Sequence, residues 1–308
     1  MTIDPASLVD AEGRPVDDKL FDDYEVYTLE LQRIFTRCWL FLGHESQIPE
    51  PGDFVQSRLG YQPMILARNA EGEIRAYRNY CRHRGYRVCH EDKGHGTQFM
   101  CDLHGWTYDL DGRLTGAYGY DEPSFTDLDQ HQWGLIPVAQ VVTYKGLIFG
   151  TYDPEAVPFE QYLGGNRPAL DRMLDQLPSG TNFAGAVFKW TIKTNWKIGA
   201  DTVRAADFML FPNASYSSAS RILHFWHPTG PGTTEVCAYL MVGKDTSEEV
   251  QREMIAHDPP LNYAMGFSRD PWVDDGDDTP EPDRVRDDPN QRAFYRRWVE
   301  LMSRDNNQ

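Results

Sequence analysis

Two short segments of the chain each carry one cysteine and one histidine, and this pattern restricts the fold more than any other feature. The first segment is Cys81-Arg-His83 and the second is Cys101-Asp-Leu-His104, with seventeen residues between them. Two thiolates and two imidazoles complete either a 2Fe-2S cluster with cysteines on one iron and histidines on the other, or a tetrahedral zinc ion. Zinc fingers pair cysteine with cysteine and histidine with histidine, whereas both pairs here are mixed. The spacing favours the iron cluster, with structural zinc as the alternative.

A glycine follows each pair, and a further turn signal lies beyond the second. These are Gly85, Gly105 and the dipeptide Asp111-Gly112. The pattern fits two ligand loops at the tips of β-hairpins. Glycine lets backbone amides approach the inorganic sulfurs, and such hydrogen bonds raise a cluster's reduction potential. The sequence thus predicts a Rieske-type cluster suited to passing electrons onward.

Further segments extend the pattern over most of the chain. They are residues 34–39 (Ile-Phe-Thr-Arg-Cys-Trp), 49–53 (Pro-Glu-Pro-Gly-Asp), 80–85 (Tyr-Cys-Arg-His-Arg-Gly), 195–197 (Asn-Trp-Lys), 210–213 (Leu-Phe-Pro-Asn) and 226–228 (Trp-His-Pro). With these motifs in this order, the chain resembles the large (alpha) subunits of Rieske non-haem iron aromatic-ring-hydroxylating oxygenases.

The resemblance implies more about fold and function than the residues alone, which indicate only the class α+β. It implies an N-terminal segment (1–38), an all-β Rieske domain (39–154) and a catalytic domain with an antiparallel sheet and flanking helices (155–308). In that family the 2Fe-2S cluster takes electrons from a ferredoxin and/or an NAD(P)H-dependent reductase. A mononuclear Fe(II) then uses O2 to hydroxylate, as a rule dihydroxylate, an aromatic substrate. A homotrimer, with or without a small beta subunit, is implied as well.

The mononuclear iron site is where the sequence departs from the family. Such a site needs two histidines and a carboxylate, and the family's histidines follow closely after Asn-Trp-Lys. Here no histidine occurs between Lys197 and His224. The resemblance assigns the carboxylate to Asp275, with Asp274 as the alternative, although a solvated acidic loop explains this charge run equally well. Asp201 matches a supporting acidic position.

The remaining histidines do not replace the missing pair. His90 and His95 lie inside the predicted cluster domain, and three isolated histidines (His44, His131 and His257) are expected to be surface or hydrogen-bonded residues. His224 and His227 are three apart on a predicted strand, which sends their side chains to opposite faces.

Two explanations of this gap lead to different functions. In one, a stretch near 202–210 has been lost from an otherwise normal oxygenase subunit. In the other, the chain as written is an electron-transfer or degenerate cluster protein, because fold resemblance alone does not carry function.

Candidate pocket residues follow from the same resemblance. The apolar side chains expected beside the iron are Phe208, Met209, Phe267 and Trp272, each of which also reads as ordinary core. Arg204 is a candidate partner for a substrate carboxylate.

Periodicity predicts the main elements. We expect a helix over 24–37, short strands at 54–58, 64–67 and 147–151, and a connector over 154–180 with one short helix near 169–176. Strands are expected at 188–193 and 236–242, then a helix opened by a Thr246-x-x-Glu249 capping box. A final helix over 291–302 should turn Ala293, Phe294, Trp298 and Leu301 inward.

Composition excludes several classes of protein. The chain has 308 residues, 40% of them apolar, and a net charge of −17, which argues against nucleic-acid and anionic-membrane partners. Five cysteines, two already assigned, fit a reducing compartment, with Cys38, Cys89 and Cys237 expected as buried apolar residues. No targeting segment or apolar run of membrane-spanning length is visible, so we expect a cytoplasmic protein.

Overall fold

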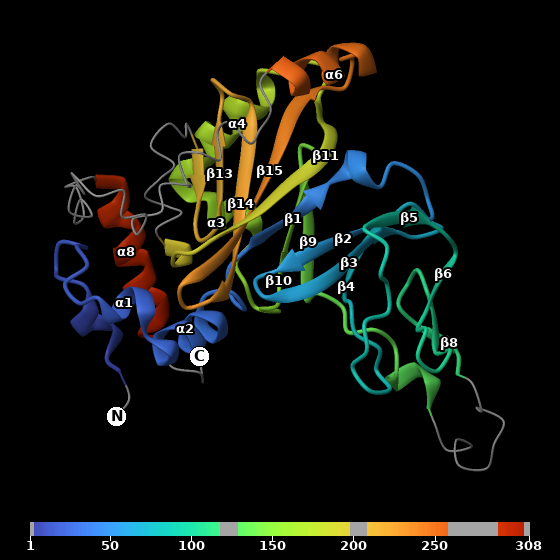
Figure 1. Ribbon diagram of the computed structural model, residues 1–308, viewed down its shortest axis with the longest axis horizontal. Helices are drawn as coiled ribbons and strands as arrows, with labels where there is room; N and C mark the ends of the chain where they lie inside the picture. Colours follow the sequence, from blue (N-terminus) through green and yellow to red (C-terminus); the bar gives the residue numbers. More distant parts are fainter. Residues whose placement is uncertain (1–2, 118–128, 198–207, 258–288, 305–308) are drawn as a thin grey trace, which may run out of the picture. The chain divides into compact units, whose positions relative to one another are not determined.

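The computed structural model describes residues 3–117, 129–197, 208–257 and 289–304 (Figure 1). The chain forms two compact units, Trp39–Phe159 and a second that joins Met1–Cys38 to Glu160–Gln308. We call the first the β unit and the second the mixed unit.

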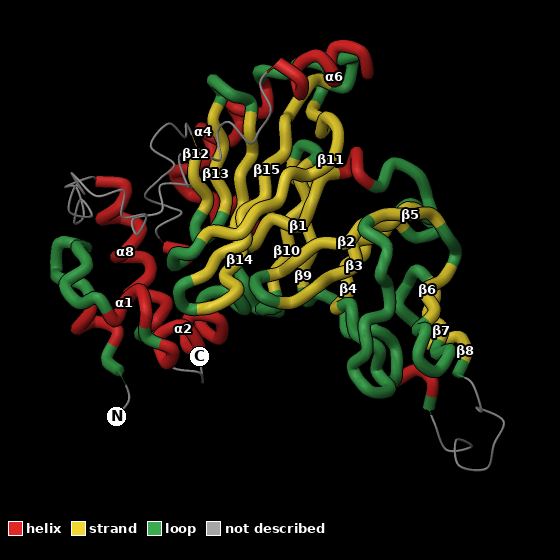
Figure 2. The backbone as a smooth tube through the Cα atoms, in the orientation of Figure 1, coloured by secondary structure: helices red, strands yellow, loops and turns green. Residues whose placement is uncertain are grey.

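The β unit contains three antiparallel sheets and no α-helix longer than one turn among its described residues (Figure 2). One sheet has the order β1-β10-β9, from Leu40–His44, Leu147–Thr151 and Gln140–Tyr144. The second has the order β4-β3-β2-β5, from Ile74–Arg78, Gln62–Arg68, Asp53–Leu59 and Lys93–His95. The third has the order β6-β7-β8, from Gln98–Met100, Thr107–Asp109 and Leu114–Gly116. The predicted strands at 54–58, 64–67 and 147–151 are confirmed as β2, β3 and β10.

Each predicted ligand segment joins two of these strands. Residues 81–86 follow β4 and precede β5, while residues 101–106 connect β6 to β7. The hydrophobic core between them contains Cys81, Cys101, Trp106 and Tyr108. The cysteines are therefore fixed by core packing, and the ligand loops begin at the edge of that core.

The mixed unit is built on one antiparallel sheet of order β11-β15-β14-β13-β12. Its strands are Thr181–Ile192, Thr233–Gly243, Ile222–Gly230, Ala214–Ser217 and Phe208–Leu210. The helices are α1 (Lys19–Asp22), α2 (Tyr24–Arg33), α3 (Phe159–Leu163), α4 (Arg167–Asp175), α6 (Glu248–His257) and α8 (Pro289–Met302). The predicted α+β class is confirmed.

A buried carboxylate ties α2 to two distant parts of the mixed unit. Glu30 accepts hydrogen bonds from the indole N–H groups of Trp196 (2.7 Å) and Trp298 (2.8 Å) and from the ammonium of Lys197 (2.5 Å). Glu30, Trp196, Lys197 and Trp298 are all fully buried. The Asn-Trp-Lys motif therefore has a structural task here, since it compensates a charge that would otherwise be buried without partners.

Several predicted helix boundaries need correction. The helix predicted over 24–37 ends at Arg33. At its start, the side chain of the N-cap Asp23 accepts hydrogen bonds from the Glu25 and Val26 amides. The connector holds two helices, α3 and α4, instead of one. Ser247, not Thr246, caps α6, because its hydroxyl accepts the Val250 amide.

The inward face of the last helix is also partly different from the prediction. Phe294, Trp298 and Leu301 are buried as expected, whereas Ala293 is exposed. Tyr295 and Met302 complete the buried face instead. The two predicted strands of the sheet are confirmed within the longer β11 and β15.

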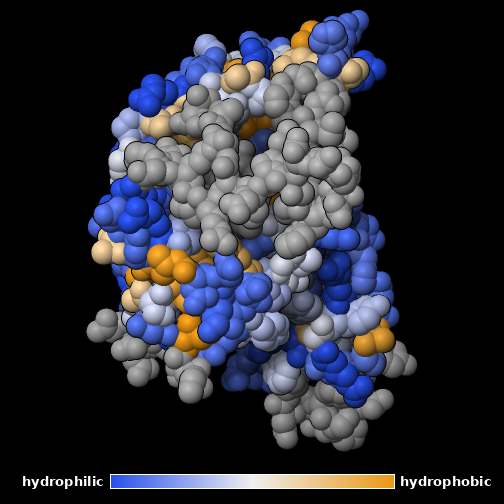
Figure 3. Space-filling model, turned by 60° about the vertical axis from the view of Figure 1, so that its left-hand side comes forward, coloured by the Kyte–Doolittle hydropathy of each residue, from blue (hydrophilic) through white to orange (hydrophobic). Residues whose placement is uncertain are grey.

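The described surface agrees with the charge of the chain. On the face drawn in Figure 3, most of that surface is hydrophilic, as the net charge of −17 leads one to expect. No described helix is long and apolar enough to cross a membrane.

Candidate metal centre

The two ligand segments fold into turns with the same backbone frame. In the first, the Cys81 amide donates to the Tyr86 carbonyl (2.7 Å) and the Gly85 amide donates to the Cys81 carbonyl (2.8 Å). The segment 101–106 repeats both bonds at the same offsets, each at 2.8 Å. The histidine is two residues after the cysteine in one loop and three in the other, so the shared frame does not depend on ligand spacing.

Glycine is required where each turn closes. Gly85 has φ +73° and Gly105 has φ +68°, both in the left-handed region that a side chain makes costly. The glycines that follow the two ligand pairs in the sequence therefore serve the backbone of the loops.

The loops bring the four predicted ligands together in two pairs. Cys81 and Cys101 are 3% and 1% exposed, and the pKa of the Cys101 thiol is raised by burial and by the neighbouring Cys81 thiol. The imidazoles of His83 and His104 are half-buried and meet edge to face, with ring centroids 4.6 Å apart. Thiols thus lie on the core side of the site and imidazoles on its solvent side.

One buried nitrogen atom makes this arrangement a good fit for a metal cluster. The Nδ1 atom of His83 is buried and has no hydrogen-bond partner among the described residues. Burial, with His104 and Arg84 nearby, lowers the pKa of His83, which keeps the ring in the neutral form that ligates metals. A buried nitrogen without a partner is costly, and this one is free to ligate iron.

The pairing of thiol with thiol and of imidazole with imidazole bears on the choice between an iron cluster and zinc. Tetrahedral zinc needs all four ligands around a single centre, whereas a Rieske cluster needs two around each iron. Cys81, Cys101, His83 and His104 therefore fit a 2Fe-2S cluster, which when bound would accept and release one electron at a time.

Tyr108, on β7, contacts the first ligand loop and was not predicted from the sequence. The Tyr108 hydroxyl lies 3.3 Å from the Cys81 sulfur and accepts the Arg82 amide at 3.0 Å. Burial and the Cys81 thiol raise the pKa of Tyr108, so its hydroxyl stays protonated and can donate to a ligand sulfur. Its position two residues after Trp106 gave no separate signal in the sequence.

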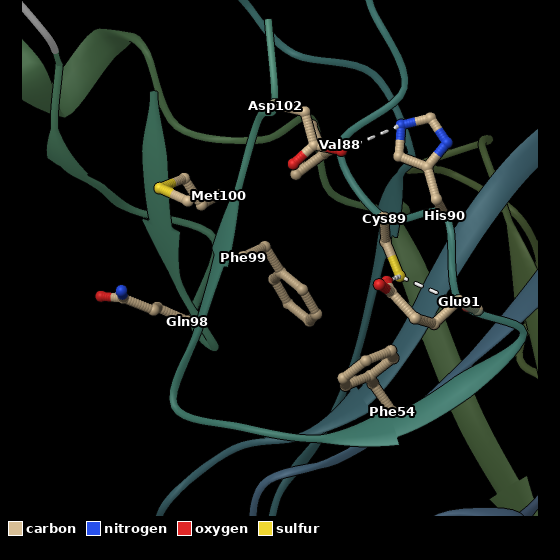
Figure 4. A pocket seen from close by; sticks show the side chains of 9 residues that line it. All are labelled: Phe54, Val88, Cys89, His90, Glu91, Gln98, Phe99, Met100 and Asp102. Atoms are coloured by element: carbon tan, nitrogen blue, oxygen red, sulfur yellow. Dashed lines mark hydrogen bonds and ion pairs between the residues drawn. The ribbon is translucent and has the colours of Figure 1, made fainter. Parts of the chain in front are cut away.

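A cavity of about 180 Å³ lies beside the second ligand loop (Figure 4). Phe54 and Phe99 meet edge to face in its wall, and His90 stands 3.9 Å from Asp102. Cys89 also lines it, but burial raises the pKa of that thiol to about 11, so it stays protonated.

Cys38, Cys89 and Cys237 are buried free cysteines, as predicted.

The other described histidines are placed much as expected. His44 is buried and contacts the Ser46 hydroxyl, while His95 contacts Asp53 at 2.9 Å. His224 and His227 both lie within the unbroken strand β14, which sends their side chains to opposite faces of the sheet.

The residues predicted for the mononuclear iron are placed less completely. Asp274, Asp275 and Asp201 lie outside the described residues, as do the pocket candidates Phe267, Trp272 and Arg204. Phe208 and Met209 are neighbours on β12, and Phe208 is buried with its side chain on the face opposite to that of Met209. A lining role for either residue in a substrate pocket therefore stays a prediction.

Comparison with known proteins identifies the domain around the ligand loops. Residues 38–125 match the Rieske 2Fe-2S domain. The chain is 42% identical over 201 residues to the biphenyl dioxygenase alpha subunit of Metapseudomonas furukawaii, covering 63% of this chain and 43% of that protein. It is 40% identical over 195 residues to a benzene 1,2-dioxygenase alpha subunit of Pseudomonas putida, with the same coverage of both chains. The chain thus spans less than half the length of these relatives.

Solved structures extend the similarity over the whole fold. A naphthalene 1,2-dioxygenase variant bound to phenanthrene superposes with a TM-score of 0.81 at 24% identity, covering 99% of this chain and 96% of that one. The naphthalene 1,2-dioxygenase of a Rhodococcus species bound to indole gives a TM-score of 0.74 at 26% identity, covering 93% and 94%. The mixed unit and the β unit therefore have the folds seen in such oxygenases. The chain is a homologue of the alpha subunits of Rieske aromatic-ring-hydroxylating dioxygenases.

Proposed function

We propose that the chain is the oxygenase component of a Rieske aromatic-ring dioxygenase, in which Cys81, His83, Cys101 and His104 hold the 2Fe-2S cluster. The observation that carries the proposal is the pair of matched ligand loops with thiols buried and imidazoles toward solvent. The cluster would receive electrons from a ferredoxin and/or an NAD(P)H-dependent reductase. Residues 39–154 then form the cluster domain and 155–308 the catalytic domain.

The second half of the proposal concerns oxygen activation. A mononuclear Fe(II), with Asp275 as its carboxylate ligand and Asp274 as the alternative, would support hydroxylation of an aromatic substrate by O2. Relatives named for biphenyl and benzene favour a small, uncharged aromatic ring. The two histidine ligands are expected in a segment that belongs near 202–210, and the functional protein is expected to be a cytoplasmic trimer, with or without a small beta subunit.

A second function follows from the same loops without the mononuclear iron. The chain as written has no histidine between Lys197 and His224, so an electron-transfer protein with a Rieske cluster alone is the competing proposal. The two proposals differ by one iron per chain.

Iron and acid-labile sulfide per chain decide between these proposals. On anaerobically reconstituted protein whose intact mass matches this sequence, the oxygenase proposal predicts three irons and two sulfides, and the electron-transfer proposal predicts two irons and two sulfides. Two irons would support the electron-transfer proposal for this chain. A colourless protein with one zinc would refute both.

Substitutions assign the ligands. Cys81→Ser and His104→Ala should abolish the paramagnetic resonance of the reduced cluster. Cys89→Ser is the matched control, because Cys89 is an equally buried free cysteine of the same unit, and it should leave the spectrum unchanged. Asp275→Ala should remove only the third iron, and an unchanged iron content in that variant would exclude Asp275 as a ligand.

A further inference from the structure

An aromatic column leads away from the ligand His83. The Trp106 ring stacks on the His83 imidazole, with centroids 5.1 Å apart and planes within 10° of parallel. The Trp133 ring meets Trp106 edge-on at 5.8 Å and 78°. Trp106 is 2% exposed, whereas Trp133 is half-buried and comes from a segment that contains no proposed ligand.

Arg82 contacts Trp133, the last ring of this aromatic stack, and the glycine that follows it. Its guanidinium carbon lies 5.7 Å from the Trp133 ring centroid, and its Nη1 donates to the Gly134 carbonyl at 3.1 Å. Arg82 is also the residue between Cys81 and His83, so one side chain joins the first ligand loop to the 133–134 segment. The printed contacts of its guanidinium are with the Trp133 ring and the Gly134 carbonyl, neither of which carries a negative charge.

The 133–135 segment is itself held firmly. The Leu135 amide donates to the Gly112 carbonyl at 2.7 Å, and a Cβ on Gly134 would lie 2.7 Å from the same oxygen. This close approach requires glycine at 134. The segment can thus act as a fixed support for the Trp133 ring.

We propose that Trp133, through Trp106, positions the His83 imidazole, and that Arg82 holds this support and raises the reduction potential of the cluster. The inference rests on the proposed function, because it assumes that His83 is a cluster ligand. Residues behind a ligand fix its orientation and tune the metal. Reduction adds one electron to the cluster, and a nearby positive charge stabilises the more negative reduced form.

The test compares graded substitutions at Arg82 and Trp133. Arg82→Met keeps the length of the side chain but removes its charge, and Arg82→Lys keeps the charge. Trp133→Leu removes the aromatic ring, and Trp133→Phe keeps one. Tyr152→Leu is the matched control, since Arg78 lies 4.8 Å from the Tyr152 centroid in the same unit.

The readouts are cluster content, the midpoint potential from mediator titration, and the g values of the reduced cluster. We expect Arg82→Met to lower the ratio of reduced to oxidised cluster about tenfold at a fixed potential, which is about 59 mV for one electron. Arg82→Lys should restore most of that shift. Trp133→Leu should change the g values, because the His83 ring loses its support, and Trp133→Phe should retain them.

Three outcomes would overturn the inference. The first is wild-type potential and g values in Arg82→Met and Trp133→Leu with full cluster content. The second is an equal shift in Tyr152→Leu. The third is a loss of cluster in Arg82→Met and Trp133→Leu, with Arg82→Lys and Trp133→Phe identical to the wild type in every readout. That result would indicate a role in folding alone. A wild-type protein without a histidine-ligated cluster spectrum would refute the proposed function instead.

Discussion

Removing the ammonium of Lys197 should destabilise the mixed unit strongly. In Lys197→Met the apolar stem is kept, but Glu30 remains fully buried with only the indole donors of Trp196 and Trp298. Breaking a buried ion pair from one side costs about 3–5 kcal/mol, because a charge is left without compensation. For a unit of this size each kcal/mol lowers the melting temperature by about 2–4 °C, so we expect a decrease of roughly 6–20 °C.

Calorimetry and urea unfolding would measure this effect on the full chain. Lys193→Met is the control, since Lys193 is exposed on the same segment, and it should change the free energy of unfolding by less than about 0.5 kcal/mol. The double variant Glu30→Gln with Lys197→Met should be more stable than Lys197→Met alone, because no charge is then buried. The reasoning is wrong if Lys197→Met melts with the wild type, or if the double variant is less stable than the single one.

Three further predictions concern the described residues. Tyr108→Phe should keep the cluster but lower its midpoint potential, because the hydroxyl 3.3 Å from the first ligand sulfur is lost, and a redox titration with unchanged potential would contradict this. Burial lowers the pKa of His224 to about 4, so the unfolded chain takes up a proton more readily than the folded chain. The free energy of unfolding should therefore be highest above pH 6.5 and fall by up to about 3 kcal/mol towards pH 4. Urea unfolding at pH 7 and pH 5 should show a loss of about 2 kcal/mol in the wild type and a clearly smaller loss in His224→Gln. Gly112→Ala should destabilise the β unit by more than Gly72→Ala in thermal unfolding, since both have positive φ but only at Gly112 would a Cβ lie 2.5 Å from the ring of Tyr77.

The ligand loops could be anticipated because their chemistry is local. Each cysteine, its histidine and the closing glycine lie within five consecutive residues, and the turn bonds join backbone groups of the same loop. Strands β11 and β15 were predictable for a similar reason, since apolar residues at every second position are written directly in their sequences. Where neighbouring residues compete for one role, local signals are weaker, and Ser247 replaced Thr246 as the cap of α6.

The contacts that support the site could not be anticipated, because they join residues far apart in sequence. Glu30 meets Trp196 and Trp298 across separations of 166 and 268 residues, and Arg82 reaches Gly134 across 52. No periodicity records which buried donor will meet which carboxylate, since that depends on how the packed elements meet. The sequence by itself therefore determined the two ligand pairs, the glycines that close their turns and the α+β class. Only the tertiary structure decided that the imidazoles face solvent, that Tyr108 lies against a ligand sulfur, and that Trp106, Trp133 and Arg82 stand behind His83, because these relations arise from packing between distant segments.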